Sequence, residues 1–267
     1  MAIEMQHTKR VALILGFVLG LAGLFLYIAV VLPGPPKEPI IKIEPVPENL
    51  PRGTVGLQVG QIYKYELVSY ELEPSLLKRA IKVFFWPIYK ITGTPVHGKV
   101  TAEEEIIYKV ADVVYFNQEP HFLIEGFQKS RLLSASPEEF RSKILFYIHA
   151  IKGKIEFQRM EDLEAHLWGK ECVRFSISNP SLFAPWYLDL RKDFRSKFRR
   201  DSYLLNAEVT GIGKLRNYQC FKVVVTAPDS LPGGKMIYWV DVNTRTTVRQ
   251  YFVYRGRIYG DFYRIAS

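Results

Sequence analysis

Cysteine and histidine are scarce in this chain, whose 267 residues include two cysteines and five histidines. Two thiols are too few for a disulfide-dense scaffold or a four-cysteine zinc site. The chain also lacks the P-loop, G-x-S-x-G, H-E-x-x-H and C-x-x-C motifs, which mark phosphate, acyl-transfer, metal and redox chemistry. We therefore predict a protein that is not an enzyme and that has no metal site and no cofactor.

The overall composition is that of a folded, aromatic-rich protein. Apolar residues make up 48% of the chain, which excludes a wholly disordered polypeptide. Aromatic residues reach 14%, with 16 Tyr and 17 Phe, and this usage favours β structure. The formal net charge is +9, which suits anionic surfaces or simple solubility.

The longest apolar run lies at Val11–Leu32 and contains no charged residue. A helix of that length spans roughly 33 Å, enough to cross a bilayer core. The run exceeds the usual apolar region of a signal peptide and does not end in an A-x-A pattern, so we predict an uncleaved transmembrane helix over residues 11–32. A cleaved signal peptide is the alternative.

The charges beside this run set the expected topology. Lys9 and Arg10 precede it, whereas Lys37 beyond it is balanced by Glu38. The positive-inside rule predicts a single-pass cell-membrane protein, with residues 1–10 in the cytoplasm and the rest extracytoplasmic. Nucleic acid is then not an expected partner.

Two glycines inside the run form a small-xxx-small pattern. Gly16 and Gly20 are four residues apart, a spacing that lets two membrane helices approach closely and form a homodimer. The alternative is that they reflect only the high frequency of glycine in membrane helices.

A proline-rich segment follows at residues 33–51. Proline fixes φ and removes a backbone donor, so we expect an extended stalk that lifts the following domain off the membrane. The alternative is that Ile40–Ile43 packs along the domain as an edge strand.

Residues 52–267 are predicted to form one extracytoplasmic β-rich domain. Gln61–Leu72 alternates apolar and polar residues, Lys99–Phe116 is a long strand broken near Ala111, and His121–Phe127 is a third strand. Short turns at Pro228–Gly234, Asn243–Arg245 and Arg255–Gly256 separate the later segments and predict a meander of neighbouring strands. The further strands are expected at Lys154–Arg159, Glu171–Ser178, Ala207–Gly213, Gln219–Ala227, Met236–Val242, Thr246–Tyr254 and Arg257–Ile265.

Two helices are expected beside these strands. Ser136 suits a helix N-cap, and Phe140, Ile144 and Ile148 then recur every four residues. Residues 182–200 form a second candidate, which is strongly basic. The predicted fold class is therefore α+β or mainly β, with a curved antiparallel sheet, packed helices and an N-terminal transmembrane helix.

The second predicted helix is amphipathic and is a candidate membrane contact. Its apolar stripe includes Phe194 and Phe198, and basic residues crowd the same segment. The alternative is a stripe that packs on the sheet with a solvated charged face. The basic residues proposed to contact lipid are Arg191, Lys192, Arg195 and Arg199.

A second apolar concentration lies at Leu76–Ile91. Phe84, Phe85 and Trp86 are consecutive, so they cannot all face one core from one strand. They are candidates for lining a lipid cavity or contacting the bilayer. The alternative is ordinary core packing around a bend at Pro87.

The two cysteines, Cys172 and Cys220, both lie in strand-like contexts. An extracytoplasmic location permits oxidation, so we predict a disulfide between them. Closing a loop of about 48 residues would stabilise the fold by roughly 4 kcal/mol in the chain-entropy model. Two buried free thiols are the alternative.

The C-terminal strands resemble a known family. The run from Asn217 to Val225, the Tyr238-Trp-Val-Asp-Val-Asn-Thr segment and Val248-Arg-Gln-Tyr look like the strands of lipoprotein-carrier-like half-barrel proteins. The resemblance implies a curved antiparallel sheet, helices that plug its concave face and an apolar cavity for acyl chains. This chain departs from the family in its predicted membrane anchor, because typical carriers are soluble.

The resemblance and the anchor together suggest two functions. The first is a non-catalytic domain that binds a lipid or a lipoprotein at the membrane surface. The second is a structural or assembly subunit of a cell-envelope complex, with another envelope protein or a second copy of the chain as its partner.

Overall fold

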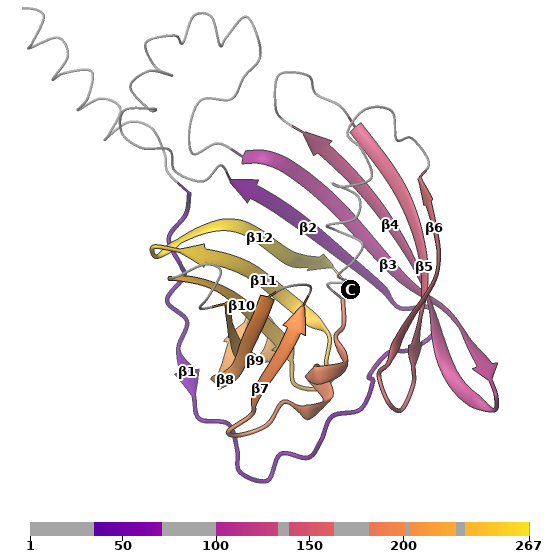
Figure 1. The fold of residues 1–267 in the computed structure, drawn as a ribbon, viewed down its shortest axis with the longest axis horizontal. Helices are drawn as coiled ribbons and strands as arrows, with labels where there is room; N and C mark the ends of the chain where they lie inside the picture. The colour runs from indigo at the N-terminus through magenta and orange to yellow at the C-terminus, as the bar shows by residue number, and fades with distance from the viewer. Residues whose placement is uncertain are drawn as a thin grey trace, which may run out of the picture.

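The computed structural model describes residues 35–70, 100–132, 139–162, 182–200, 203–227 and 233–266. Within these ranges the chain forms one 12-stranded antiparallel sheet, which is strongly curved (Figure 1). The strand order is β1-β8-β9-β10-β11-β12-β2-β3-β4-β5-β6. β7 also pairs with β8, along the same edge as β1. The curved antiparallel sheet that the family resemblance implied is therefore present.

One part of the sheet is built from long hairpins. β3 is 17 residues long, and its register shifts between Val110 and Asp112, where the sequence predicted a break. Two-residue turns need left-handed backbone, and Asn117 and Gln118 supply it between β3 and β4, with φ of 50° and 68°. The strands of this part are β2 (Ile62–Tyr70), β3 (Val100–Phe116), β4 (Glu119–Leu132), β5 (Glu139–His149) and β6 (Ile155–Asp162).

The other part is the predicted meander. Consecutive strands pair from β8 to β12, and the β12–β2 pairing joins the meander to the hairpins. The predicted turns at Asn243–Arg245 and Arg255–Gly256 are confirmed. The strands of this part are β1 (Ile43–Glu44), β7 (Arg195–Arg200), β8 (Tyr203–Leu215), β9 (Tyr218–Thr226), β10 (Gly234–Asp241), β11 (Thr247–Tyr254) and β12 (Arg257–Ala266).

The predicted helices are wrong, and with them the α+β assignment. Phe140, Ile144 and Ile148 lie on strand β5, and residues 182–200 contain only the 3-10 turn η1 (Pro185–Asp189) before strand β7. A spacing of four residues places side chains on one face of a helix and also on one face of a strand. The apolar pattern alone therefore could not separate the two structures, and the described residues form an almost all-β protein.

The concave face of the sheet holds the main core. Tyr65, Ile124, Phe146 and Phe221 point into it from four different strands and are fully buried. Residues 182–190, here called the plug, cover its base and bury Leu182, Phe183, Tyr187, Leu188 and Leu190. Fully burying a large apolar side chain contributes about 1.5–3 kcal/mol, so the plug is an integral part of the fold.

The convex face of the meander carries a second core. Cys220, Ile237, Trp239, Tyr251 and Val253 are buried there. Their cover is an extended segment, residues 35–46, here called the strap. It descends beside β12 and β11 toward the edge at β8 (Figure 1), and its side chains Ile41 and Ile43 pack against this core.

The strap begins at the β11–β12 turn. The Pro36 carbonyl accepts a hydrogen bond from the Ile258 N–H at 2.8 Å, and the Glu38 N–H donates to the Gly256 carbonyl at 3.3 Å. The Arg257 guanidinium also donates to the Pro35 carbonyl at 3.1 Å. The chain is thus fixed to the domain from its first described residue.

The strap then crosses two strands and ends at the edge of the sheet. The Glu38 carboxylate lies 2.9 Å from the Lys235 ammonium and 3.4 Å from that of Lys222. Burial alone would raise the pKa of Glu38, but the two lysines lower it overall. Ile43 and Glu44 finally pair with β8 as strand β1.

Residues 35–51 therefore differ from the expected free stalk. The alternative of an edge strand near Ile40–Ile43 is seen in part, because Ile43 pairs with Gly213. Glycine permits this close approach: a Cβ on Gly211 would lie 2.2 Å from Ile43 Cγ2, and one on Gly213 would lie 3.0 Å from the Lys42 carbonyl.

Several sequence predictions fall outside the described residues. These are the transmembrane helix over residues 11–32 with Gly16 and Gly20, the strand at Glu171–Ser178, and the segment that holds Phe84, Phe85 and Trp86. Among the residues with described structure, no helix has the length and apolar character needed to cross a membrane.

Candidate functional site: the concave face of the sheet

A row of half-buried side chains crosses the concave face above the plug. Met236 on β10 is directly opposite Phe252 on β11, Phe252 is opposite Gly260 on β12, and Gly260 is opposite Ser69 on β2. Residues that are directly opposite point to the same face of a sheet, and Met236 packs on the concave core. All four positions are only partly buried. This row is here called the apolar row after Met236 and Phe252, and Ser69 is its polar end.

Gly260 has no side chain in the middle of the apolar row, and the gap that this leaves among the described residues is here called the hollow. A Cβ placed on Gly260 would have no described atom within 4 Å, in contrast to Gly126, whose added Cβ would lie 2.3 Å from Ile144 Cγ2. Glycine inside a strand often marks a place where a ligand or another backbone comes close. Tyr259 is buried beside the hollow, and its ring lies 6.5 Å from that of Phe252.

An aromatic cluster continues the apolar surface toward β7 and β8. The ring of Trp186 stacks with those of Phe194 at 6.1 Å and Phe198 at 6.2 Å, and it meets the edge of Tyr238 at 5.6 Å. Phe194 and Phe198 were predicted to contact lipid from a helix. The segment is not a helix, and both side chains pack against the concave core, each half-buried. Their contact with lipid stays a prediction.

A buried polar network closes the base of the concave face. The Arg264 guanidinium donates to Thr246 Oγ1 at 2.6 Å, to the Thr247 carbonyl at 2.7 Å and to the Tyr65 hydroxyl at 3.0 Å. The Tyr65 hydroxyl itself donates to the Thr247 carbonyl at 2.7 Å. Arg264 is 3% exposed, and its guanidinium also lies 4.8 Å from the centre of the Tyr63 ring.

This environment keeps the buried phenols neutral. Burial raises the pKa of Tyr63 to about 12, although the positive charge of Arg264 opposes the shift. Burial also raises the pKa of Tyr65 and of Tyr187. No acid–base role follows from phenols that stay protonated at neutral pH, so we assign this network to the stability of the base.

A second buried arginine anchors the plug to the chain beneath it. The Arg245 guanidinium donates to the carbonyls of Leu190 at 2.9 Å, Tyr187 at 3.4 Å and Pro51 at 3.4 Å. Its Nε has no hydrogen-bond partner and faces Gly53, whose added Cβ would lie 2.2 Å away. The space beside Nε is therefore filled by backbone, and Arg245 has a structural role.

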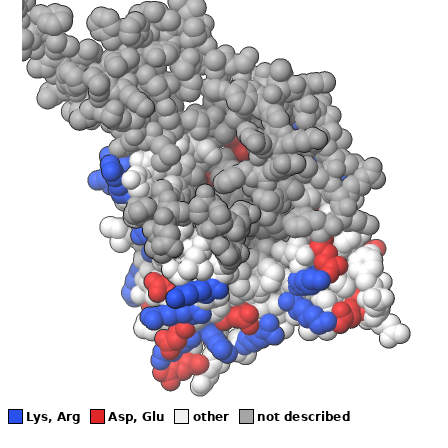
Figure 2. Space-filling model, viewed as in Figure 1, with Lys and Arg blue, Asp and Glu red and all other residues white. Residues whose placement is uncertain are grey.

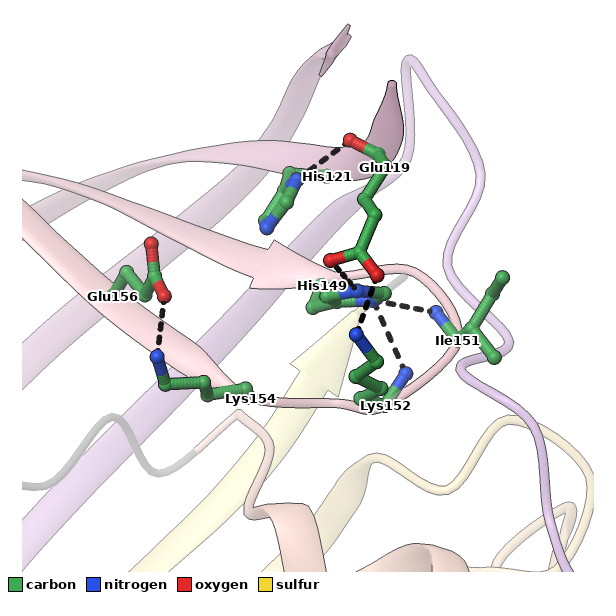
Figure 3. Close-up of polar contacts among 7 residues, drawn as sticks. All are labelled: Glu119, His121, His149, Ile151, Lys152, Lys154 and Glu156. Carbon is green, nitrogen blue, oxygen red and sulfur yellow. Dashed lines mark hydrogen bonds and ion pairs between the residues drawn. The ribbon is translucent and has the colours of Figure 1, made fainter. Parts of the chain in front are cut away.

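Two histidines meet at the lower ends of β4 and β5. His121 and His149 are directly opposite each other, both are buried, and their rings lie 4.7 Å apart. Glu119 lies between His149 Nε2, at 2.9 Å, and the Lys152 ammonium, at 2.5 Å (Figure 3). Both contacts lower the pKa of Glu119, with that of Lys152 the larger.

The cluster of His121, His149 and Glu119 stabilises the β5–β6 turn. His149 Nδ1 accepts hydrogen bonds from the N–H groups of Ile151 at 3.1 Å and Lys152 at 3.2 Å (Figure 3). Nδ1 must then be unprotonated, which places the proton of the neutral ring on Nε2, facing Glu119. Both ring nitrogens are occupied, and no group of three or more metal-binding side chains occurs in the described part of the chain.

Three of the basic residues predicted to contact lipid, Arg191, Lys192 and Arg195, are exposed, and two of these have acidic partners. Lys192 pairs with Glu48, and Arg195 Nε lies 3.9 Å from Glu208, while Arg191 is exposed and Arg199 lies in β7. Figure 2 shows basic and acidic side chains intermixed along the lower left of the molecule, where β7 lies. The described side chains of this surface do not form the one-sided basic face of the predicted helix.

Cys220 is buried on β9 with a free thiol, and burial raises its pKa well above the usual range. Cys172 lies outside the described residues. The predicted disulfide between the two therefore has no support in the structure.

The sequence carried little signal for the apolar row. Gly260 interrupts an otherwise alternating strand, and this interruption was the one visible hint. The row itself depends on the register of four strands that are far apart in the chain.

No family model matches this chain, and no curated protein matches it. The weakly similar solved structures include the following three. A protein named as exported, with a YmcC-like fold, from Bacteroides fragilis is 9% identical, with a TM-score of 0.35 over 80% of this chain and 97% of its own. A beta-barrel-like protein of a domain family of unknown function from Brucella abortus is 8% identical, with a TM-score of 0.39 over 78% and 96%.

The third structure is a protein named as a lipoprotein, from Parabacteroides distasonis. It is 9% identical, with a TM-score of 0.28 over 79% of this chain and 97% of its own. Likenesses of this strength support neither a shared fold nor a shared function, so we base no conclusion on them.

Proposed function

We propose that this protein is a non-catalytic, membrane-anchored extracytoplasmic domain that binds one apolar chain, such as the acyl chain of a lipid, on its concave face. The observation that carries the proposal is the hollow at Gly260 within the apolar row, where an added Cβ would meet no described atom. Phe252 and Tyr259 border the hollow on one side and Ser69 on the other. Ligand sites use such a lining of apolar and aromatic side chains with a few polar groups.

The geometry of the row suits an elongated ligand. Met236, Phe252 and Gly260 lie side by side on three adjacent strands, which are about 4.8 Å apart in any sheet. The aromatic cluster around Trp186 extends the apolar surface beyond Met236. An acyl chain that crosses the strands would bury its methylenes against both, at about 0.8 kcal/mol for each methylene.

The anchor and the side of the membrane are supported by the sequence. The uncharged run at residues 11–32 and the flanking Lys9 and Arg10 favour a single span with the domain outside the cytoplasm. A domain held at a bilayer can receive an acyl chain without a soluble carrier step. We therefore favour local lipid handling over a diffusing shuttle.

The test is photo-crosslinking of the full chain in membranes with a diazirine-bearing fatty acid. We expect adducts on the β10–β12 peptides that hold Met236 and Phe252. Gly260→Ala should lower the yield partly and Gly260→Val by about tenfold, because each fills more of the hollow. Gln219→Val places the same side chain on an exposed position of β9 and should leave the yield unchanged.

Thermal unfolding of each variant separates binding from folding. Gly260 lies in an extended strand, and an added Cβ would meet no described atom within 4 Å, so valine should leave the melting temperature within a few degrees. Equal adduct yields in the wild type and in a folded Gly260→Val variant would contradict the proposal.

A further inference from the structure

The region where the strap meets the β11–β12 turn concentrates positive charge. Lys37, Arg255 and Arg257 lie together there, because Lys37 pairs with Arg257 as an isolated bridge and Arg255 occupies the turn between the strands. Residues 33–37 and 254–257 contain no acidic residue. Glu38 is turned away onto Lys235 and Lys222 on the convex face.

Arg255 is held in an exposed, unfavourable backbone conformation. Its φ is 50° and that of Gly256 is 73°, the left-handed pair that a two-residue turn requires. Asparagine, aspartate or glycine is the usual residue at the first of these positions, and a long side chain there costs about 1 kcal/mol. No described acidic side chain pairs with Arg255, whose guanidinium instead lies 5.2 Å from the Tyr254 ring.

The strap fixes this turn close to the predicted membrane span. Only residues 33 and 34 separate Leu32, the end of the apolar run, from Pro35, whose carbonyl accepts a hydrogen bond from Arg257. Three residue steps reach roughly 10 Å at full extension. The headgroup layer of a bilayer is of similar thickness, so the turn could not lie far outside it.

The β11–β12 turn and the start of the strap lie at one end of the sheet (Figure 1). The strap starts at the upper left, beside the β11–β12 turn, whereas the β3–β4 turn lies at the opposite, lower right end (Figure 1). At the upper end of the coloured part of the left edge, Figure 2 shows basic side chains with no acidic side chain beside them.

We propose that the β11–β12 turn and the start of the strap form a membrane-docking face, in which Lys37, Arg255 and Arg257 bind anionic lipid headgroups and Tyr254 lies at the interface. Lysine and arginine are attracted to anionic bilayers, and tyrosine is enriched at the boundary between headgroups and acyl chains. The strap thus holds this end of the sheet close to the bilayer. This inference rests on the proposed membrane anchor.

The consequence for the domain is a fixed orientation. The apolar row includes Phe252 and Gly260, which lie on the two strands that the docked turn joins. Docking would bring this end of the concave face toward the bilayer surface, from which an acyl chain would be taken.

The test compares two tyrosines in the full chain reconstituted into vesicles. Benzoylphenylalanine replaces either Tyr254, beside the docked turn, or Tyr115, which is 70% exposed and lies two residues before the β3–β4 turn. The vesicles contain phosphatidylcholine alone or with phosphatidylglycerol. We expect lipid adducts at position 254 to exceed those at position 115 by about tenfold, and to increase when phosphatidylglycerol is present.

Charge reversal supplies the matched control. Lys37→Glu with Arg255→Glu should lower the adduct yield at position 254 by about fivefold in phosphatidylglycerol vesicles, whereas Asn117→Glu at the distant turn should not change it. Equal yields at positions 254 and 115 in a chain that floats with the vesicles would overturn the docking face while leaving the anchor intact. A chain that does not float would overturn both, and crosslinking of the fatty acid would still report on the apolar row.

Discussion

The meander and the long hairpins are parts of one sheet, but they are covered differently. In the meander, the plug covers the concave face and the strap covers the convex face. In the hairpins, the convex face of β4 and β5 carries Phe127, which is 40% exposed, and the ion pair between Lys143 and Glu125. Strands of the meander are therefore buried on two faces, and strands of the hairpins mainly on one.

This difference in cover explains why strands β9 and β10 of the meander contain runs of apolar residues, whereas β2 of the hairpins alternates. β9 (Tyr218–Thr226) contains three consecutive valines, and β10 ends in a run of buried residues from Trp239 to Asp241. β2 alternates apolar and charged residues from Tyr63 to Leu67, as expected of a sheet with one solvated face. A run of apolar residues in an antiparallel meander thus indicates that a further segment covers its outer face, which here is the strap.

The largest loss of stability is expected at the β12–β2 junction between the meander and the hairpins. Arg264 on β12 binds the Tyr65 hydroxyl on β2 and the Thr247 carbonyl on β11. Arg264→Ala should lower the free energy of unfolding by about 4 kcal/mol, because it leaves several buried polar groups unpaired. Lys214→Ala, at an exposed position, should change it by less than about 0.5 kcal/mol. Chemical denaturation measures both, and a loss under about 1 kcal/mol for Arg264→Ala would show that the junction does not depend on this network.

The second prediction compares the loss of stability when a side chain is shortened on the convex face of the meander and on that of the hairpins. Ile237 on β10 is fully buried beneath the strap, and Phe127 on β4 is not. Ile237→Ala should cost about 3 kcal/mol, and Phe127→Ala about 1 kcal/mol or less, although phenylalanine is the larger side chain. Equal losses in urea unfolding would contradict the difference in cover.

The strap can be tested separately from the core. An added Cβ on Gly211 would lie 2.6 Å from the Glu44 carbonyl, so Gly211→Ala should displace strand β1 and cost about 3 kcal/mol. Gly233→Ala is the matched control, because Gly233 also has a positive φ but open space around it, and it should cost about 1 kcal/mol. Hydrogen exchange should become faster in residues 41–44 only in the first variant; unchanged exchange there would show that the strap does not depend on the glycine.

The smallest predicted change is a fall in stability at alkaline pH. The pKa of Tyr63 is raised to about 12 in the folded state, so above pH 10 the unfolded chain releases this proton before the folded chain does. Stability should then fall as the pH rises from about 10 to 12, by at most about 1.4 kcal/mol per pH unit for each such tyrosine. Tyr63→Phe should reduce this fall by about 1 kcal/mol, measured by denaturation at pH 9 and pH 11. An unchanged slope would contradict the raised pKa.

The strands could be predicted from the sequence because alternation and turn residues are local signals. The β3 irregularity next to Ala111 and the turn at Arg255 were both found in this way. The helices were wrong since the four-residue spacing of Phe140 and Ile144 fits a strand equally well. Local patterns alone do not separate the two when no partner strand is known.

The candidate site could not be predicted because it depends on long-range register. Gly260 reaches Ser69 across a separation of 191 positions in the chain, and His121 meets His149 only through the β4–β5 pairing. The prolines of the strap favoured a free spacer, and packing on the domain was only the alternative, at Ile40–Ile43. The hydrogen bonds from Pro35 and Pro36 show that proline carbonyls, which remain acceptors, are enough to fix such a segment to a sheet.

The central claim is that the concave face holds an apolar chain at Gly260, and native mass spectrometry of the intact protein, isolated from membranes, tests it most directly. The account predicts about one lipid mass per chain that is released on activation, retained in Gln219→Val and lost in Gly260→Val. A wild-type chain that carries no lipid, or an equal lipid load in the two variants, would contradict it.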